Sequence, residues 1–341
     1  MAGLGSRVRF LACNRLGSRL RTWWPAEALA AEGWDAEALM VVPEPGTVDV
    51  LWVHRPTTLD HTLAIQAHQA HGCAIVVDED DDLTALPAKH GWKPDPRILE
   101  HHHRCLGMAD ALSLSTDRLA EVYGPRANAD ADVHVLRNYL PERIGSYAAG
   151  NGPPADGLVR LGWAGITMTH RHDLEWLAPE ANNLMRPPAV FTSVGDPFAT
   201  QEALNLRGRV DKVHPFSFDE AEFYRAMARA DVGLVPLEPN AFNEAKSWLK
   251  ASEFAALGKP SVVSALPEQC FWVEQSGGGV SARTPAEFTA WGRWLVEDAA
   301  ARALLGRRAK AWAIANTIER RVGQWEQLLV GLGAEKAEVW S

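Results

Sequence analysis

The chain has 341 residues, 47% of them hydrophobic and 23% charged, and its formal net charge at pH 7 is −9. At roughly 100 to 200 residues per domain, this length predicts two domains. No apolar run approaches the roughly 18 residues of a membrane span, no apolar leader precedes the strand-like "VRFLAC", and the four cysteines form no CxxC pair. We therefore exclude a membrane span, a disulfide scaffold and a zinc knuckle. We expect a cytoplasmic protein with reduced thiols, and composition indicates no oligomeric state.

Strand and helix signals alternate along the first 140 residues. Short apolar stretches predict strands at 7–13, 48–54, 73–78, 111–115 and 132–138. Between them, helical patterns occupy 23–33, 59–72, 94–109 and 116–124. This alternation is typical of a doubly wound parallel sheet.

The Gly/Pro-rich stretch "GSYAAGNGPPADG" (145–157) interrupts the pattern, and we place a domain linker there. The alternation then restarts with strands expected at 158–165, 189–195, 212–216, 231–237, 261–265 and 278–282. Helices are expected at 172–185, 219–230, about 245–257, 284–306 and 317–332, the fourth with Thr284 as N-cap. We expect an N-terminal domain over 1–148, a second domain over 149–317, and a segment 318–341 whose helix packs back toward the first domain.

The stretch "FNEAKSWLKASEFAALGKPSVVS" (242–264) carries the clearest candidate site. In a helix beginning near Ala245, Lys246, Lys250 and Glu253 fall at i, i+4 and i+7 on one stripe. A helix N-terminus after a strand attracts an anion, two lysines suit a diphosphate, and a carboxylate can accept two hydrogen bonds from a ribose diol. The alternative is a solvent-exposed helix with a Lys250–Glu253 pair worth about 0.2–0.5 kcal/mol.

The longer segment 242–268 resembles the donor-site motif of GT-B glycosyltransferases, especially glycosyltransferase family 4 and its phage and bacterial relatives. There a pattern close to F-N-x-x-K-S-x-x-K-x-x-E-[YF]-x-x-x-G-x-P-V-V-x-S recurs. "VRLGWAGITMTHRHDLEWL" (159–177) is similar to the family's G-[WY]-x-G-x-x-x-H-x-x-D-L loop, and "VVDEDDDLTALP" (76–87) resembles part of its acceptor domain. The resemblance implies an α/β GT-B fold, in which two Rossmann-like domains turn their parallel sheets toward a central cleft.

The resemblance also implies a function and a donor site. The protein would be a glycosyltransferase, of hexosyl or pentosyl type, that uses a UDP-sugar or else a GDP-sugar, transfers with retention and requires no other cofactor. Glu253 would bind ribose, and Lys246, Ser247 and Lys250 would lie near the diphosphate. The donor site would also include Gly165, Thr169, His170 and Asn243. One departure is that many family members carry a sugar-contacting glutamate where this chain has Ala245.

The first domain supplies further candidates for catalysis. His54 and Arg55 end one expected strand and Asp80 follows the next, so all three point to the cleft; with Lys250 they form our catalytic set. The alternative for a lone strand-end histidine is a structural role. We interpret "DEDDD" (78–82) as a solvated turn, predict no metal site, and interpret "HHHRC" (101–105) as helix surface.

Basic residues near the N-terminus indicate a possible acceptor surface. Arg15, Arg19 and Arg21 precede any acidic residue, and Trp23 and Trp24 follow. Arginines with aromatics are typical of nucleic-acid binding, and phage relatives of this sequence type indicate a hydroxymethylated base in double-stranded DNA as one acceptor, used in the host cytoplasm. The alternatives are a solvated basic loop, and a cell-surface saccharide or a small molecule as acceptor.

A different class of function also fits two Rossmann-like domains. A dehydrogenase would need a GxGxxG turn between strand and helix, which the chain lacks. A non-catalytic nucleotide-sugar-binding protein stays open, because Ala245 replaces a glutamate that meets the sugar in the family.

Overall fold

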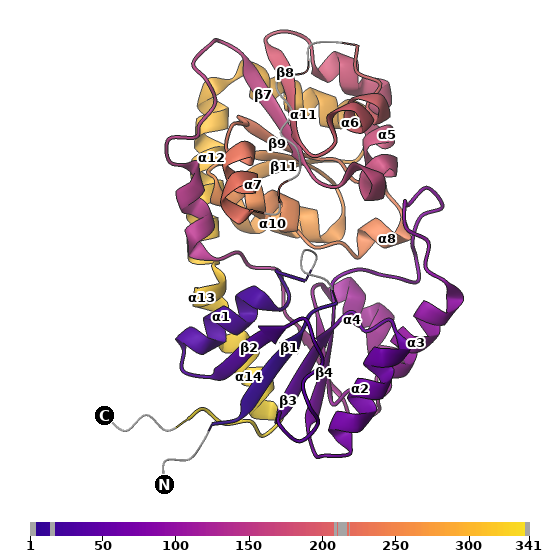
Figure 1. Cartoon of the computed structure of the whole chain (residues 1–341). Helices are drawn as coiled ribbons and strands as arrows, with labels where there is room; N and C mark the ends of the chain where they lie inside the picture. Colours follow the sequence, from indigo (N-terminus) through magenta and orange to yellow (C-terminus); the bar gives the residue numbers. More distant parts are fainter. Residues whose placement is uncertain (1–4, 14–17, 208–209, 211–216, 218, 338–341) are drawn as a thin grey trace.

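The computed structural model describes residues 5–13, 18–207, 210, 217 and 219–337. Two sheets lie one above the other in Figure 1, each flanked by helices, and their carboxyl edges are turned toward the middle of the molecule. Within the described residues, no helix is long and apolar enough to cross a membrane. All four cysteines are free thiols.

The N-terminal sheet has six parallel strands in the order β2-β1-β3-β4-β5-β6. Its central strands β3 and β4 are buried on both faces, as expected for continuous apolar runs in a covered parallel sheet. The strands are β1 (Arg7–Leu11), β2 (Asp35–Leu39), β3 (Val50–His54), β4 (Ala74–Glu79), β5 (Ala111–Leu114) and β6 (Asp132–Val135).

The second sheet has five parallel strands in the order β11-β10-β9-β7-β8. They are β7 (Val159–Ala164), β8 (Ala189–Val194), β9 (Val232–Val235), β10 (Ser261–Ser264) and β11 (Gly279–Ala282). Between the sheets the chain passes through the 3₁₀ helix η2 (Glu142–Ala148), close to the linker that the sequence predicts. The expected strand at 212–216 lies outside the described residues.

Helices cover both sheets. Those of the first half are α1 (Trp23–Ala31), α2 (Leu59–Gln69), α3 (Pro96–Leu106), α4 (Asp117–Tyr123) and the 3₁₀ helix η1 (Gly124–Arg126). Those of the second half are α5 (Thr167–Leu184), α6 (Pro197–Ala203), α7 (Glu220–Met227), α8 (Ala241–Glu244), α9 (Leu249–Ala256), α10 (Pro267–Ser276), α11 (Pro285–Glu297), α12 (Ala299–Ala315), α13 (Ile318–Arg321) and α14 (Gly323–Gly331).

Several element boundaries differ from those expected. Thr284 caps α11 as predicted, its hydroxyl accepting from the Glu287 amide at 3.2 Å. The helix expected over 284–306 nevertheless ends at Glu297, because Asp298 leaves helical geometry and caps α12 through the Ala301 amide. Strand β2 was not predicted, since "DAEAL" has weak β-propensity and its pairing with β1 decides its state.

The end of the chain returns to the N-terminal domain. Helix α14 packs against α1, and the Trp34 indole donates to Glu326 at 2.9 Å. One buried apolar cluster runs from Phe10 and Trp52 of the first sheet to Phe254 on α9 and Trp325 on α14. The two domains therefore share a core around the segment that joins them.

Candidate active site

A cavity of about 560 Å³ lies between the two sheets. Its wall is formed where strands end, by Arg55 after β3, Asp80 after β4, and Thr169 and His170 after β7. Carboxyl ends of parallel strands are where such folds bind ligands, and about 300–1,000 Å³ is the usual volume of a small-molecule site. The predicted site residues in this wall are Arg19, Arg55, Asp80, Thr169, His170, Lys246, Ser247, Lys250 and Glu253.

The donor-side helix begins at Leu249 rather than near Ala245. The stretch forms short α8, a turn, and then α9. In a continuous helix the Ala245 carbonyl would accept from Leu249, but here it accepts from the Thr116 hydroxyl of the N-terminal domain at 3.0 Å. Lys246 and Ser247 therefore lie in the turn, and the unpaired first amides of α9 lie at the cavity wall with Leu249 and Lys250.

Among the described residues, one carboxylate oxygen of Glu253 accepts a hydrogen bond and the other has only an ion-pair contact. The Tyr224 hydroxyl donates to Oε1 at 3.0 Å, whereas Lys250 Nζ stays 3.7 Å from Oε2. The residue is only 6% exposed, and this burial raises the pKa of its carboxyl although Lys250 opposes the rise. A buried acceptor left without a donor costs about 1–3 kcal/mol. Oε2 is thus suited to accept from the hydroxyls of a ligand.

Two ammonium groups line the same cavity wall, and one of them, that of Lys250, lies beside the Glu253 carboxylate. Lys246 Nζ is 3.1 Å from Asp81 Oδ1 of the other domain and 4.4 Å from the ring centre of Phe242. Lys250 pairs only loosely with Glu253. Lys246 can exchange its partly exposed partner Asp81 for a bound anion, and Lys250 is held only by the long contact with buried Glu253. The contact between Lys246 and Asp81 joins the two domains across the cleft.

Asp173, buried on α5, holds the adjoining wall together. It accepts from His170 Nδ1 at 2.9 Å, from the Asn243 amide group at 2.6 Å and from the Glu238 backbone amide at 2.9 Å. Burial lowers the pKa of His170 despite Asp173, so the ring is neutral at pH 7. With Nδ1 donating to Asp173, Nε2 is an acceptor.

Two predicted donor residues support this wall from behind. Asn243 is fully buried and joins α8 to α5 through Asp173, outside the cavity wall. Gly165 is also outside the wall; a Cβ there would come within 3.1 Å of the Trp163 ring. The structure therefore places both in packing positions rather than in contact with the cavity.

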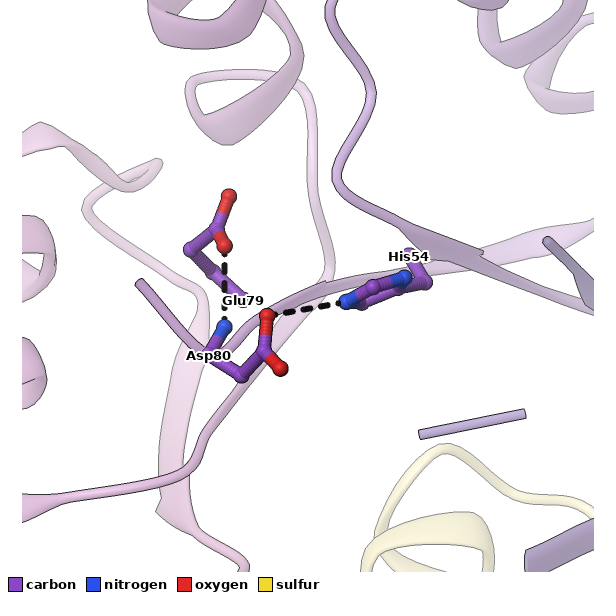
Figure 2. A group of neighbouring side chains, drawn as sticks. All are labelled: His54, Glu79 and Asp80. Atoms are coloured by element: carbon purple, nitrogen blue, oxygen red, sulfur yellow. Dashed lines mark hydrogen bonds and ion pairs between the residues drawn. The ribbon is translucent and has the colours of Figure 1, made fainter. Parts of the chain in front are cut away.

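The N-terminal wall contains a chain of hydrogen bonds through His54. This histidine is 1% exposed, with Nε2 3.1 Å from Asp80 Oδ1 and Nδ1 2.9 Å from the Ser18 hydroxyl. Figure 2 shows the Asp80 carboxylate facing the ring, while Glu79 turns back to the Asp80 amide. Burial alone would lower the pKa of His54, but the hydrogen bonds to Asp80 and Cys13 raise it to about 10. His54 thus lies behind the cavity wall and orients Asp80.

Arg55 neutralises the acidic run that follows β4. Its guanidinium pairs with Glu79 at 3.1 Å, with Asp81 at 2.9 Å and with Asp80. Its backbone has φ +50°, an uncommon conformation for a residue other than glycine, which ordinarily costs about 1–3 kcal/mol. The three carboxylates hold the residue in this conformation.

The interpretation of "DEDDD" as a solvated turn was wrong. Asp78, Glu79 and Asp82 are buried, since β4 runs through the middle of its sheet. His54, Glu79 and Asp80 bring potential ligand atoms within 4.8 Å of one another. A guanidinium already supplies the positive charge that this group of carboxylates requires, so we assign no metal site.

The stability contribution of His54 should decrease with rising pH. Its folded-state pKa lies above the ordinary value of 6.5, so protonation stabilises the fold. This contribution is complete below pH 6.5 and is lost as the pH rises toward 10. We expect the difference in unfolding free energy between Cys13→Ser and Cys13→Ser/His54→Gln to fall above pH 7, by at most about 1.4 kcal/mol per pH unit.

Urea unfolding of both variants at several pH values measures this difference. The Cys13→Ser background removes a thiol that touches His54. Burial raises the pKa of this thiol, but hydrogen bonding to His54 and the charge of His54 lower it by more, so the net pKa is lowered. A difference independent of pH would mean that folded His54 carries no extra proton.

The arginines predicted for the acceptor occupy different environments. Arg21 is 1% exposed and binds Asp78 through two hydrogen bonds of 3.0 and 2.7 Å, so it cannot meet an acceptor phosphate. Arg19 lies in the cavity wall, 3.9 Å from Glu220. Arg15 lies outside the described residues. Trp24 is buried at the cavity and donates to Glu220 at 3.2 Å.

Ala245 is fully buried and packs in the apolar cluster of the N-terminal domain. A glutamate here would place a charge in that cluster rather than in the cavity. The "HHHRC" helix also differs from expectation: His102 is fully buried, with Nε2 3.0 Å from Glu79. Through this contact α3 is joined to Glu79 at the end of β4.

Sequence reasoning missed several wall residues. Tyr224 lies 29 positions from the carboxylate that it binds, and Asn138 lies 109 positions from Ser247, to which it donates at 2.8 Å. Trp92 and Gln269 also line the cavity. No local pattern marks such residues, because their partners are distant in sequence.

No protein-family model and no curated protein matches the chain. Among solved structures, a sucrose-phosphate synthase from Thermosynechococcus elongatus is 15% identical with a TM-score of 0.71, over 96% of this chain and 99% of that one. Anabaena HepE in complex with UDP-glucose is 13% identical with a TM-score of 0.69, over 96% and 99%. A UDP-forming trehalose-phosphate synthase from Burkholderia xenovorans is 13% identical with a TM-score of 0.58, over 84% and 74%. The chain is thus similar to them in fold, and it has the GT-B architecture of two Rossmann-like domains around a central cleft.

Proposed function

We propose that the protein is a glycosyltransferase that moves a sugar from a UDP-sugar to a hydroxyl acceptor. The observation that carries the proposal is the Glu253 oxygen that lacks a hydrogen-bond donor among the described residues, in an interdomain cavity that Lys246 and Lys250 also line. The carboxylate oxygen can accept hydrogen bonds from ribose hydroxyls, and the two ammonium groups suit a diphosphate. Structures of similar fold support the choice of nucleotide, since HepE forms complexes with UDP and with UDP-glucose. A GDP-sugar is the alternative donor.

In this proposal the protein acts mainly through charge and position. The bond between the anomeric carbon and the diphosphate breaks, and negative charge grows on the leaving oxygen. The Lys250 ammonium and the first amides of α9 stabilise that charge. The acceptor oxygen attacks the anomeric carbon from the face that the diphosphate leaves, which gives retention. The proton of the acceptor hydroxyl passes to the leaving phosphate. Retention is also the subject of a study of trehalose-6-phosphate synthase, a protein of similar fold.

For the acceptor we propose a saccharide or a small hydroxylated molecule. Trp92, Leu86 and Ile166 give the cavity mouth apolar surface, and Asp80 and Asp81 supply acceptors for hydroxyl groups. The hydroxymethylated base of phage DNA, to which the family-4 resemblance points, is the second candidate. It would rely on Arg19 and on residues outside the cavity, because Arg21 is buried.

An acceptor panel tests the proposal. The protein is mixed with UDP-glucose, UDP-N-acetylglucosamine and GDP-mannose and with modified and unmodified DNA, lipid-linked saccharides and small glycosides. We expect mass spectrometry to find one glycosylated product, together with slow release of free nucleoside diphosphate. We also expect EDTA to leave most activity, since lysines and helix amides supply the positive charge. Nucleotide binding without hydrolysis or transfer would instead indicate a non-catalytic binding protein.

Glu253→Ala should weaken UDP binding about 10- to 100-fold, or about 1.5–3 kcal/mol, the range for hydrogen bonds to a charged group. The fold should persist, because the change removes a buried carboxylate that lacks a full set of partners. Calorimetric titration with UDP measures the effect. Glu244→Ala is the matched control, since that residue is exposed on α8 and lies outside the cavity wall. Equal affinity of wild type and Glu253→Ala would remove Glu253 from the site.

A further inference from the structure

A second cavity, of about 390 Å³, lies behind α9 where the two domains join. Its wall comes from the interdomain segment 138–146, from Ser252 and Ala256 of α9, and from residues 312–317 at the end of α12. This volume also falls within the usual range for small-molecule sites, about 300–1,000 Å³. None of the residues assigned above to donor binding lines it.

The wall of this cavity, which we call the hinge cavity, combines apolar surface with one buried polar group that has no partner among the described residues. Tyr139, Leu140, Trp312 and Ile314 supply the apolar part. Thr317 is 4% exposed, and its hydroxyl has no hydrogen-bond partner among the described residues. Such a group in a cavity wall favours a ligand that can hydrogen-bond to it.

Charged side chains of the cavity wall indicate the charge of that ligand. Arg143 is already held by Glu27 at 3.0 Å and by Glu220 at 2.8 Å. Lys310 forms no ion pair with any residue that the structure describes, and Glu142 is the carboxylate of the wall. An unpaired ammonium beside an apolar chamber is suited to a carboxylate with an apolar body.

One helix and one side chain connect the two cavities. Helix α9 presents Lys250 and Glu253 to the donor cavity and Ser252 and Ala256 to the hinge cavity. Asn138 lines both cavities, and its side chain donates to the Ser247 hydroxyl at 2.8 Å. The backbone carbonyl of Asn138 accepts from the Trp248 indole at 2.8 Å.

An aromatic contact completes this connection. The Trp312 ring, in the hinge-cavity wall, packs edge-on against Trp248 with centroids 5.4 Å apart. A molecule in the hinge cavity would contact both the interdomain segment and the helix that carries the donor site. A ligand that touches both sides of a hinge favours one arrangement of the domains.

We propose that the hinge cavity is a second ligand site, for a small carboxylate with an apolar body, and that its occupation changes the affinity of the donor site. Binding of the carboxylate in the hinge cavity does not depend on the proposed function. The effect on donor affinity rests on that function, because it requires UDP to bind at the donor cavity.

Binding is tested with 2-naphthoate as the probe, by calorimetry and ligand-observed NMR. We expect saturable binding to the wild type, weakened at least about tenfold by Ala313→Trp or Ser146→Trp, which fill the cavity. Ala315→Trp, exposed on the same helix and outside the wall, should bind as the wild type does. Lys310→Gln should weaken 2-naphthoate at least about threefold and leave uncharged 2-naphthamide unchanged, whereas Arg307→Gln should affect neither. Absence of saturable binding, or binding that neither filling variant weakens, would overturn the site.

Coupling is tested by measuring the Kd for UDP with and without saturating 2-naphthoate. A change of about fivefold or more is expected in the wild type and none in Ala313→Trp, and UDP should change the probe's Kd by the same factor. If UDP binds with the same Kd in the presence and absence of 2-naphthoate, the proposed coupling between the two cavities is wrong. If UDP fails to bind while the probe binds as expected, the proposed function is wrong and the hinge site stands.

Discussion

Replacing Lys250 with alanine is expected to lower kcat about 10²- to 10³-fold, the loss typical of removing one charge-stabilising donor from a transition state. Its ammonium lies in the cavity wall, where its only described ion pair is a loose 3.7 Å contact with Glu253. Negative charge on the diphosphate is larger in the transition state than in bound donor. The Kd for the intact UDP-sugar should therefore rise less than about tenfold.

Steady-state kinetics and titration with the intact UDP-sugar on the same preparation separate the two effects. Lys250→Arg should recover part of kcat, since the positive charge remains. Lys93→Ala is the control, because Lys93 is exposed and outside the wall. A loss of affinity for the UDP-sugar with an unchanged kcat would show that Lys250 binds the donor without favouring the transition state.

Replacing Arg21 with methionine is expected to lower the free energy of unfolding by about 3–5 kcal/mol, the range for breaking a buried ion pair from one side. Arg21 and Asp78 are each about 1% exposed, and two hydrogen bonds join them. Removal of the guanidinium would leave the buried Asp78 carboxylate with only a long contact to His54 at 4.0 Å and a hydrogen bond from Ser113. Asn138 would also lose the 2.9 Å hydrogen bond that orients its amide toward Ser247.

Chemical denaturation followed by tryptophan fluorescence measures this loss. Arg9→Met, which removes a partly exposed pair with Asp35, should cost less than about 1 kcal/mol. The double variant Arg21→Met/Asp78→Leu should be more stable than Arg21→Met, since it removes the unpaired charge as well. A loss no larger than that of Arg9→Met would show that Arg21 is not the main counter-charge of Asp78.

Much of the fold could be predicted from periodicity. The apolar strands around Val53, Val77 and Leu234 alternate with helices, and that pattern predicts two parallel sheets that meet at their carboxyl edges. The pattern failed where a neighbouring segment decides the conformation. Strand β2 depends on pairing with β1, and the break between α8 and α9 depends on a hydrogen bond from Thr116.

The candidate site was predictable where its residues lie on one local element. Lys250 and Glu253 are three positions apart on α9, and strand ends position Arg55 and Asp80, so topology brings them to the cleft. Arg21 was placed in the wrong environment because sequence does not tell whether a loop arginine faces water or a buried carboxylate. Asp78, its partner, is 57 positions away.

By itself, then, the sequence determined what depends on neighbours along the chain: the alternation of strands and helices, the caps, and the charged face of α9. Only the tertiary structure decided which charges stay available. It neutralises "DEDDD" with Arg55 and Arg21, buries Ala245 against the other domain, and gives one oxygen of Glu253 no hydrogen-bond donor among the described residues. The physical reason is that a helix needs contacts only three or four residues apart. Burial, ion pairing and hydrogen-bond satisfaction depend instead on groups separated by tens to hundreds of residues.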